Sequence, residues 1–314
     1  MSAVRSHSGD KVAIMVLSSN PDRPFGSLLT AMVTPFTDDG AVDYAAARKL
    51  ASWLVAQGCD GILVNGTTGE SPTTDEAEKK ELVAAIVDEV GGQVAILAGA
   101  GSNHTGHAAQ MAKDAVAAGA DGILVVTPYY SRPSQKGVIA HISAVAEAGG
   151  VPTMIYDVPG RTGVPVSPDS YQKLAEHPLV VATKDATGNV GAAAGLKQRT
   201  GLVWYSGDDM LLLPFLAQGG AGVIGVATHA VARQFRQAID AWDAGDHSGA
   251  LAAFVSTVPA IQAINGAGMQ AVMAKAAAQL LDVIPNRAVR EPLVTADDDE
   301  VATLRAGLVE AGVL

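Results

Sequence analysis

The sequence predicts an α/β fold, a (β/α)8 TIM barrel with a C-terminal helical extension. Three observations lead to this prediction. Apolar segments alternate with Ala-rich helical segments, eight such pairs follow one another from residue 27, and each apolar segment is continuously rather than alternately hydrophobic. Continuous hydrophobicity indicates strands that are buried on both faces, as in a parallel sheet covered by helices. Eight such units within about 200 residues fit a closed barrel.

Helical stretches that end in glycine separate the expected strands. Residues 44–58, 75–91 and 104–119 are examples, and each ends in the glycine that helix C-termini prefer. An open dinucleotide-binding sheet is the competing architecture. However, the Gly-x-Gly at 99–101 lacks the third glycine of that fingerprint, so we interpret these glycines as backbone clearance at a strand end. The eight expected strands fall within residues 27–36, 61–65, 94–101, 122–130, 153–160, 180–188, 203–209 and 221–229.

Three regions are expected along the chain. Residues 1–26 hold only a short apolar stretch between polar flanks, too short for the core of a signal peptide. We expect a disordered or extended tail there, on a cytoplasmic protein. Residues 27–235 are expected to form the barrel. Residues 236–314 contain only helical patterns, so we expect a helical region that packs on the barrel.

Composition and charge argue against several kinds of partner. The 314-residue chain is 48% hydrophobic and 17% charged, and its formal net charge of −11 argues against a nucleic-acid-binding surface. Cys59 is the only cysteine and the seven histidines show no HExxH spacing, so neither a disulfide nor a metal site is expected. No apolar run approaches the length of a membrane span, so we expect no membrane partner.

Chemically active side chains follow the expected strands at their C-terminal ends, where barrel enzymes carry their active sites. Lys184 comes directly after an apolar run in the sixth strand, Tyr156 lies near the end of the fifth, and Arg161 follows it. Residues 66–70, "GTTGE", follow the second strand. Burial disfavours the charged form of an amine, and a lysine that loses its charge is a nucleophile. If the barrel closes, these groups meet at one mouth.

These groups together suit a carbon–carbon bond-forming reaction through a Schiff base. A lysine kept neutral by apolar surroundings attacks a ketone to form an imine, and the resulting enamine attacks a second carbonyl. A tyrosine beside a hydroxyl relay can move the protons. The consecutive N–H groups of the Thr67–Thr68 turn can bind the carboxylate of a keto acid. No cofactor is required.

Each group also has a purely structural interpretation. The turn at 66–70 could cap the next helix, and Arg161 could hold an exposed carboxylate. Lys184 could form an ordinary ion pair with Asp185 or Glu70. If these interpretations hold, the chain is a binding barrel or a scaffold rather than an enzyme.

Two further pairs of residues have such interpretations. Tyr129 and Tyr130 could be aromatic residues of a protein interface. Asp208 and Asp209 are expected to cap the helix that begins near Met210. Only the convergence of all these groups at one barrel mouth favours catalysis over the structural interpretations.

Five motifs occur in the order of one family: "GTTGESPT", "VVTPYYSRPSQKG", "YDVPGRTG", "TKDATGN" and "YSGDD". The chain thereby resembles the dihydrodipicolinate synthase (4-hydroxy-tetrahydrodipicolinate synthase) family, within the pyruvate-dependent class I aldolase superfamily. The resemblance covers the chain from about Phe25 to the C-terminus. It implies a cofactor-independent condensation of pyruvate with L-aspartate 4-semialdehyde in the diaminopimelate route to lysine. It also implies a homotetramer, assembled as a dimer of dimers.

The resemblance implies roles for the matching residues. Lys184 would form the Schiff base with pyruvate, and Tyr156 would shuttle protons. Tyr156 would be linked to Thr67 and to Tyr130, which a second subunit would supply across a tight dimer interface. The backbone amides of Thr67 and Thr68 would hold the pyruvate carboxylate. The other implied substrate contacts are Arg161, for the carboxylate of the semialdehyde, and Gly207 and Ile224, which would line the pocket near the lysine.

Arg161 separates the synthase from its nearest alternative. The related N-acetylneuraminate lyases resemble this chain in the lysine and the tyrosine but typically carry "GSTGE" and lack "PGRTG". This chain has the synthase form of both stretches. The alternative function is another pyruvate-dependent class I aldolase, such as N-acetylneuraminate lyase or a keto-deoxy-sugar acid aldolase.

The resemblance further implies a regulatory pocket at the dimer interface, the allosteric pocket of family members that lysine inhibits. The matching positions here are Glu76, Lys79, Asn103, His107 and Tyr129. Lys79 puts a cation where a bound lysine would be repelled, and His107 replaces an acid. We therefore expect weak or absent inhibition by lysine.

Overall fold

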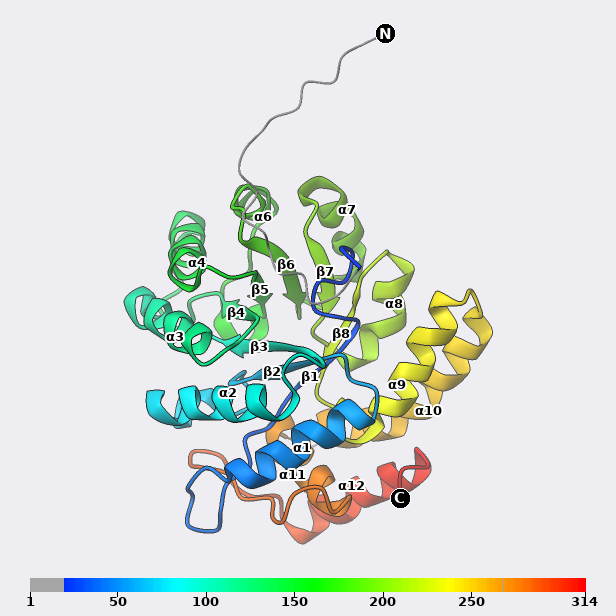
Figure 1. Ribbon diagram of the computed structural model, residues 1–314. Coiled ribbons are helices and arrows are strands. Elements are labelled where there is room, and N and C mark those ends of the chain that lie inside the picture. The colour runs from blue at the N-terminus through cyan, green and yellow to red at the C-terminus, as the bar shows by residue number, and fades with distance from the viewer. Residues whose placement is uncertain (1–19, 267) are drawn as a thin grey trace.

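Eight parallel strands close into a barrel in the computed structural model of this chain, which describes residues 20–266 and 268–314 (Figure 1). The strands follow one another in sequence order, and β8 pairs with β1 to close the barrel. Each strand lies within one of the apolar segments expected from the sequence. The strands are β1 (Leu28–Ala31), β2 (Gly61–Val64), β3 (Ala95–Gly99), β4 (Gly122–Val126), β5 (Thr153–Asp157), β6 (Val180–Asp185), β7 (Val203–Ser206) and β8 (Gly222–Gly225).

Helices surround the barrel and connect successive strands (Figure 1). Helix α2 begins with a capping box, in which Asp75 and Glu78 each accept a hydrogen bond from the backbone N–H of the other. The connecting elements are α1 (Tyr44–Ala56), η1 (Ser71–Thr73), α2 (Glu76–Val90), α3 (Thr105–Ala117), α4 (Gln135–Gly149), α5 (Pro159–Thr162), α6 (Pro168–Ala175), α7 (Val190–Thr200), η2 (Asp209–Leu211) and α8 (Leu212–Ala217).

Two apolar layers stabilise the barrel. The outer layer lies between strands and helices, where the tilted rings of Tyr171 and Trp204 have their centroids 5.0 Å apart. The inner layer fills the barrel and includes Leu29, Tyr205 and Ile224. Because successive strand residues point to opposite faces, every strand contributes to both layers. This alternation explains the continuous hydrophobicity of the strands.

The C-terminal region is helical, as expected, and its helices lie side by side along one flank of the barrel (Figure 1). Helix α12 begins with a capping box between Asp297 and Glu300. The division between residues 235 and 236 stays a prediction, and this position lies inside α9. The helices are α9 (Thr228–Asp243), α10 (His247–Gly266), α11 (Gln270–Leu280) and α12 (Asp298–Glu310).

The expected tail, residues 1–26, is only partly described, because residues 1–19 lie outside the described residues. Arg23 forms two hydrogen bonds with Asp243 at the end of α9, at 2.5 and 2.8 Å. Phe25 is buried in the inner layer of the barrel. The contacts of Arg23 and Phe25 therefore tie the segment just before β1 to the barrel.

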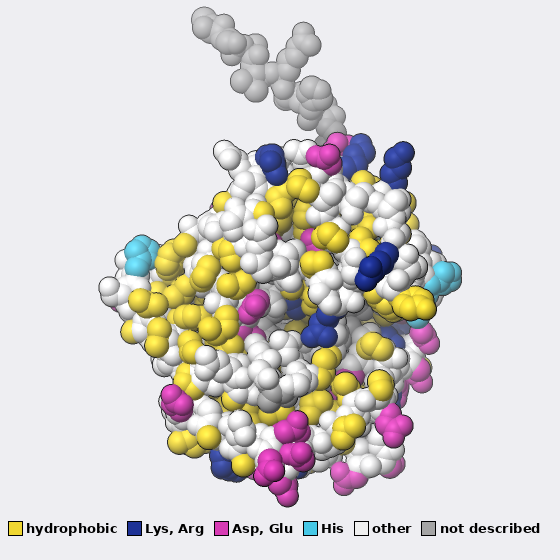
Figure 2. Space-filling view, turned by 180° about the vertical axis from the view of Figure 1, so that it is seen from behind, with side chains coloured by type: hydrophobic (Ala, Val, Ile, Leu, Met, Phe, Trp, Pro, Cys, Tyr) yellow, Lys and Arg dark blue, Asp and Glu magenta, His cyan; other side chains and the backbone are white. Residues whose placement is uncertain are grey.

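Helix α10 departs from one expectation, because by length and composition it could cross a membrane. Core helices of water-soluble proteins pass the same test. Helix α10 packs on α9, where the rings of Phe254 and Phe235 lie 6.3 Å apart. Its outer face keeps Leu251 and Val255 more than half exposed. Figure 2 shows hydrophobic side chains gathered on the flank that this helix forms.

Candidate active site

Lys184 and Tyr156 lie side by side inside the barrel. They are register partners on β6 and β5, and the Lys184 Nζ lies 4.7 Å from the centroid of the Tyr156 ring. The next residues, Asp157 and Asp185, point outward because side chains alternate along a strand. Of the polar pairs that end these two strands, only the lysine and the tyrosine therefore belong to the barrel interior.

Burial makes the Lys184 amine less basic. Its side chain is 4% exposed, and loss of hydration lowers its pKa from 10.5 to about 8. The charge of Asp209 raises this pKa and that of Arg161 lowers it. At pH 7 roughly a tenth of such amines are neutral. The expected neutral lysine is therefore a minor population, but one far larger than in a solvated lysine.

The turn after β2 presents two backbone N–H groups. Glu70 N–H donates to the Thr67 carbonyl at 3.1 Å and Gly69 N–H to the Gly66 carbonyl at 3.0 Å, which closes the turn. Among the described residues, we find no acceptor for the N–H groups of Thr67 and Thr68. The capping interpretation of this turn is wrong, because the side chain that caps α2 is that of Asp75. The free N–H groups make the turn suitable for a carboxylate.

The side chain of Thr67 lies near the Tyr156 phenol. Thr67 lowers the pKa of Tyr156, whereas burial raises that pKa more strongly. At neutral pH the phenol therefore keeps its proton and can pass it along the hydroxyl of Thr67. The two residues are placed where the expected relay needs them, and the relay itself stays a prediction.

Arg161 lies in the short helix α5 at the barrel mouth and is exposed. Its guanidinium makes only long contacts at the start of α11, 3.7 Å to the Met269 sulfur and 3.5 Å to the side-chain Oε1 of Gln270. Within the part of the chain that the structure describes, no carboxylate pairs with it. Its charge nevertheless affects the pKa of both Tyr156 and Lys184. It is therefore available for an anion from solution.

Gly207 and Ile224 lie where small or apolar side chains are needed. A Cβ atom at Gly207 would lie 3.2 Å from Cε of Lys184 and 2.9 Å from the Ala186 Cβ, so a larger residue would crowd the lysine. Ile224 is fully buried in the inner layer, which Tyr156 also joins. Both positions are consistent with a tight pocket around the amine.

The structural interpretation of Lys184 as a member of an ion pair is wrong. Glu70 pairs instead with Lys275 of α11, and both side chains are buried. Asp185 accepts a hydrogen bond from Nε1 of Trp204 at 2.9 Å, on the outer side of the barrel. Lys184 therefore has no carboxylate in direct contact among the described residues.

Asp209 has a role that sequence reasoning missed. Asp208 caps η2, as expected, but the Asp209 carboxylate is buried and accepts hydrogen bonds from the N–H groups of Val226 and Ala227 and from Asn265. It is also the negative charge that raises the pKa of Lys184. The expected capping role is wrong for Asp209 because the loop turns its side chain inward. The motif "YSGDD" marked the position but not the direction of its side chain.

Tyr129 and Tyr130 stand at the rim of a cleft of about 670 Å³ that Thr67, Tyr156 and Arg161 also line. Tyr130 is 90% exposed and has a φ of +70°, a left-handed conformation that a tyrosine rarely adopts. No contact between Tyr130 and Tyr156 is found within this chain. These properties fit the interpretation of Tyr130 as an interface residue.

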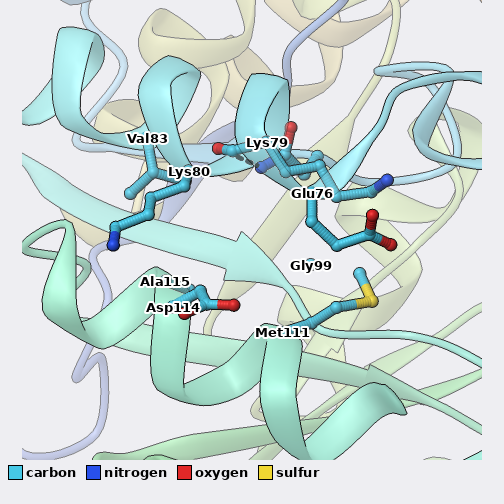
Figure 3. A pocket seen from close by; sticks show the side chains of 9 residues that line it. Glu76, Lys79, Lys80, Val83, Gly99, Met111, Asp114 and Ala115 are labelled. Carbon is cyan, nitrogen blue, oxygen red and sulfur yellow. Dashed lines mark hydrogen bonds between the residues drawn. The ribbon is translucent and has the colours of Figure 1, made fainter.

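The residues of the implied regulatory pocket line the far end of the same cleft. His107 Nε2 lies 2.8 Å from the Glu76 carboxylate, and its Nδ1 lies 3.2 Å from the Ser102 hydroxyl. Lys79 donates a hydrogen bond to the Thr74 carbonyl, and burial lowers its pKa. Figure 3 shows how Glu76 and Lys79 of α2 lie opposite α3, over a small cavity of about 10 Å³. That cavity is too small for an amino acid, whereas the open cleft is large enough for one.

The geometry thus combines a buried lysine on a closed barrel with a tyrosine relay and an anion-binding turn. A profile of the Dihydrodipicolinate synthetase family matches residues 24–311. The chain belongs to the dihydrodipicolinate synthetase family. The family, the barrel fold and the class of Schiff-base lyase that the sequence predicted are thereby confirmed.

Individual members of the dihydrodipicolinate synthetase family agree with this chain over nearly its whole length. The 4-hydroxy-tetrahydrodipicolinate synthase of Bifidobacterium longum (strain DJO10A) is 50% identical over 291 residues, which are 93% of this chain and 96% of the relative. The crystal structure of DHDPS from Cyanidioschyzon merolae with lysine bound has a TM-score of 0.88 at 38% identity, covering 92% of this chain and 99% of that one. A monomeric dihydrodipicolinate synthase variant has a TM-score of 0.87 at 33% identity and covers 92% and 98%.

Proposed function

We propose that this chain is a 4-hydroxy-tetrahydrodipicolinate synthase, which condenses pyruvate with L-aspartate 4-semialdehyde, and that the imine forms on Lys184. The observation that carries the proposal is the pairing of Lys184 with Tyr156 inside the barrel, 4.7 Å from amine to ring centroid. The synthase names of its relatives favour this reaction over that of N-acetylneuraminate lyase or a keto-deoxy-sugar acid aldolase.

The first half of the reaction builds a nucleophile from pyruvate. The neutral amine of Lys184 attacks the ketone carbon, and loss of water gives a protonated imine. The N–H groups of Thr67 and Thr68 hold the carboxylate, so that the ketone carbon faces the amine. Loss of a methyl proton then gives an enamine, and the Tyr156–Thr67 relay carries protons to and from the reacting atoms.

The second half forms the carbon–carbon bond. The enamine carbon attacks the aldehyde carbon of the semialdehyde, and the new alkoxide takes a proton from the relay. The amino group of the semialdehyde then attacks the imine carbon, which closes the ring and releases the Lys184 amine. Arg161, exposed at the mouth and without a carboxylate partner among the described residues, binds the carboxylate of the second substrate.

Borohydride trapping tests this proposal. Incubation with pyruvate and borohydride should add one reduced pyruvate per chain, and peptide mapping should find it on Lys184. In parallel reactions without borohydride, turnover of pyruvate should require the semialdehyde rather than sugar-derived aldehydes. An unchanged mass, or an adduct on another lysine, would overturn the assignment of Lys184. Faster turnover with a sugar-derived aldehyde would favour the alternative aldolase.

The active protein is proposed to be a homotetramer, a dimer of dimers, acting in the cytoplasm in the diaminopimelate route to lysine. Tyr130 supports this assembly, because a 90% exposed tyrosine in a left-handed conformation at the cleft rim gains contacts when a second copy covers it. In that assembly each Tyr130 extends the relay of the partner's site. One structural relative is a monomeric variant, so sedimentation of the wild-type chain, and of Tyr130→Ala, is the measurement that decides.

A further inference from the structure

The carboxylate-binding turn ends at a buried acid. Glu70 is 2% exposed and has a φ of +54°, which is a left-handed conformation. Its own N–H donates to the Thr67 carbonyl at 3.1 Å, so Glu70 closes the turn that carries the free amides of Thr67 and Thr68. A glutamate that only finished a surface turn would keep its carboxylate in water. This one instead points into the protein.

The partner of Glu70 comes from the far end of the chain. Lys275 of α11 is fully buried and forms an ion pair with the Glu70 carboxylate. Its ammonium also donates to the Ala288 carbonyl at 2.7 Å and lies 4.0 Å from the centre of the Phe36 ring. Hydrogen bonds and the ring therefore replace much of the hydration that burial removes from the ammonium.

A second cation completes the arrangement. The backbone N–H of Arg290 donates to the other carboxylate oxygen of Glu70 at 3.0 Å. The Arg290 guanidinium binds Glu78 with two hydrogen bonds, of 2.7 and 2.5 Å, and donates to the Thr73 carbonyl at 2.7 Å. We call these four residues, Glu70, Glu78, Lys275 and Arg290, the Glu70 cluster. The cluster contains two acids and two bases, and it joins the segment after the turn to the C-terminal region.

We infer that Glu70 and Lys275 are positioning residues for the Thr67–Thr68 turn, and that the C-terminal helices thereby set the affinity of the site for the keto-acid carboxylate. Without Lys275, the buried carboxylate of Glu70 has lost its counter-charge and must rotate toward water or take up a proton. Either change releases the turn at Glu70. The free amides of Thr67 and Thr68 then no longer converge on one anion.

The inference rests on the proposed function, because it assigns pyruvate as the ligand of the turn. It also makes a selective prediction. The turn binds the first substrate, whereas the second substrate is bound by Arg161 in α5, whose contacts with the α11 end are to Met269 and Gln270 rather than to a member of the Glu70 cluster. Loss of the cluster should therefore raise the KM for pyruvate and leave the KM for the semialdehyde nearly unchanged.

The test compares Lys275→Met, Glu70→Gln and the double variant with a control, Arg236→Met. Arg236 forms a partly buried ion pair with Asp60, 3.1 Å apart, just before β2 at the opposite end of the barrel. Each single variant should raise the KM for pyruvate about tenfold or more, with a smaller fall in kcat. The double variant replaces the ion pair by neutral groups of similar size, so it should recover most of the loss. Arg236→Met should lower the melting temperature without raising this KM.

Hydrogen–deuterium exchange of residues 66–70 is measured in the same variants without substrate. The exchange rate should increase in the single variants only. This second measurement separates the two proposals, because it does not need pyruvate to be the ligand. If wild-type protein traps no pyruvate yet the exchange quickens, the proposed function fails and the positioning role stands. If Lys275→Met does not fold, Glu70→Gln alone decides. An unchanged KM and unchanged exchange in the folded variants, or an equal rise of KM in Arg236→Met, would overturn the inference.

Discussion

Tyr156 and Lys184 are register partners on neighbouring strands, with the amine 4.7 Å from the ring centroid. This relationship places the amine and the phenol of the proposed reaction next to each other. The ring lies beside the amine, and the phenol at its far end is close enough to Thr67 for that side chain to lower its pKa. The following predictions test the parts of this arrangement separately.

The pH dependence of imine formation tests the basicity of Lys184. Because burial lowers its pKa to about 8, the rate of trapping with pyruvate should rise about tenfold per pH unit below that value and level off above it. Stopped reactions with borohydride from about pH 6 to about pH 10 give this profile. Lys184→Arg should trap nothing at any pH. A rate that keeps rising up to the pKa of an ordinary lysine would show that the amine is not desolvated.

The proton relay is tested by removal of one oxygen. Tyr156→Phe should lower kcat by about two to four orders of magnitude, because a general acid–base group is lost while the barrel interior keeps its shape. Tyr205→Phe is the matched control, since its phenol also lies inside the barrel but donates to the Gly26 carbonyl at the opposite end. Steady-state turnover and thermal unfolding of both variants are compared. Equal kcat values for the two variants would contradict the relay.

The role of Arg161 is tested by whether its removal affects the second substrate more than pyruvate. Arg161→Ala should raise the KM for the semialdehyde about tenfold to a hundredfold, as expected for loss of a charge-assisted contact, and leave pyruvate trapping on Lys184 intact. Arg305→Ala, an exposed arginine of α12, is the control. If trapping falls as much as turnover does, Arg161 acts on the imine rather than on the second substrate.

Inhibition by lysine tests the cleft beyond the active site. We expect the cleft to have little affinity for L-lysine. The cation of Lys79 repels a bound lysine, and the carboxylate of Glu76 is already paired with His107. We expect a weak inhibition constant or none, measured at saturating pyruvate. Lys79→Ala should increase inhibition if the repulsion is the cause. A sub-millimolar constant for the wild type would contradict the prediction, and the lysine-bound relative makes this outcome a real test.

Sequence patterns predicted those parts of the site that depend on local order along the chain. Alternation of strands and helices, together with the motifs, brought Lys184, Tyr156, Thr67 and Arg161 to one end of a barrel. The sequence patterns could not predict contacts between residues that are far apart in the chain. Nothing in "GTTGE" indicates that Glu70 pairs with Lys275, because that contact depends on how α11 folds back. The inward turn of Asp209 was missed for a similar reason, since its partners follow β8 and end α10.

Asp157 links the site to stability, because it follows Tyr156 on β5 but points into the outer layer. Burial raises its pKa from 3.8 to about 6, and the neighbouring charge of Asp185 adds to this shift. The folded protein therefore binds a proton there that the unfolded chain releases. The stabilising contribution is fully present below about pH 4 and is lost as the pH rises through about 6. Its size is on the order of 2–3 kcal/mol.

Chemical denaturation of wild type and Asp157→Asn between about pH 4 and about pH 7 measures this contribution. Two buried histidines, His141 and His229, have pKa values lowered to about 4 and act in the opposite sense, destabilising the fold as the pH falls. Both histidines are present in wild type and variant, so their contributions cancel in the difference between the two free energies of unfolding. The asparagine can still accept the hydrogen bond from Tyr171, which spans 3.0 Å in the wild type. The variant should therefore be relatively more stable at pH 7 than at pH 4, and a difference that does not change with pH would show that Asp157 ionises at its ordinary pKa.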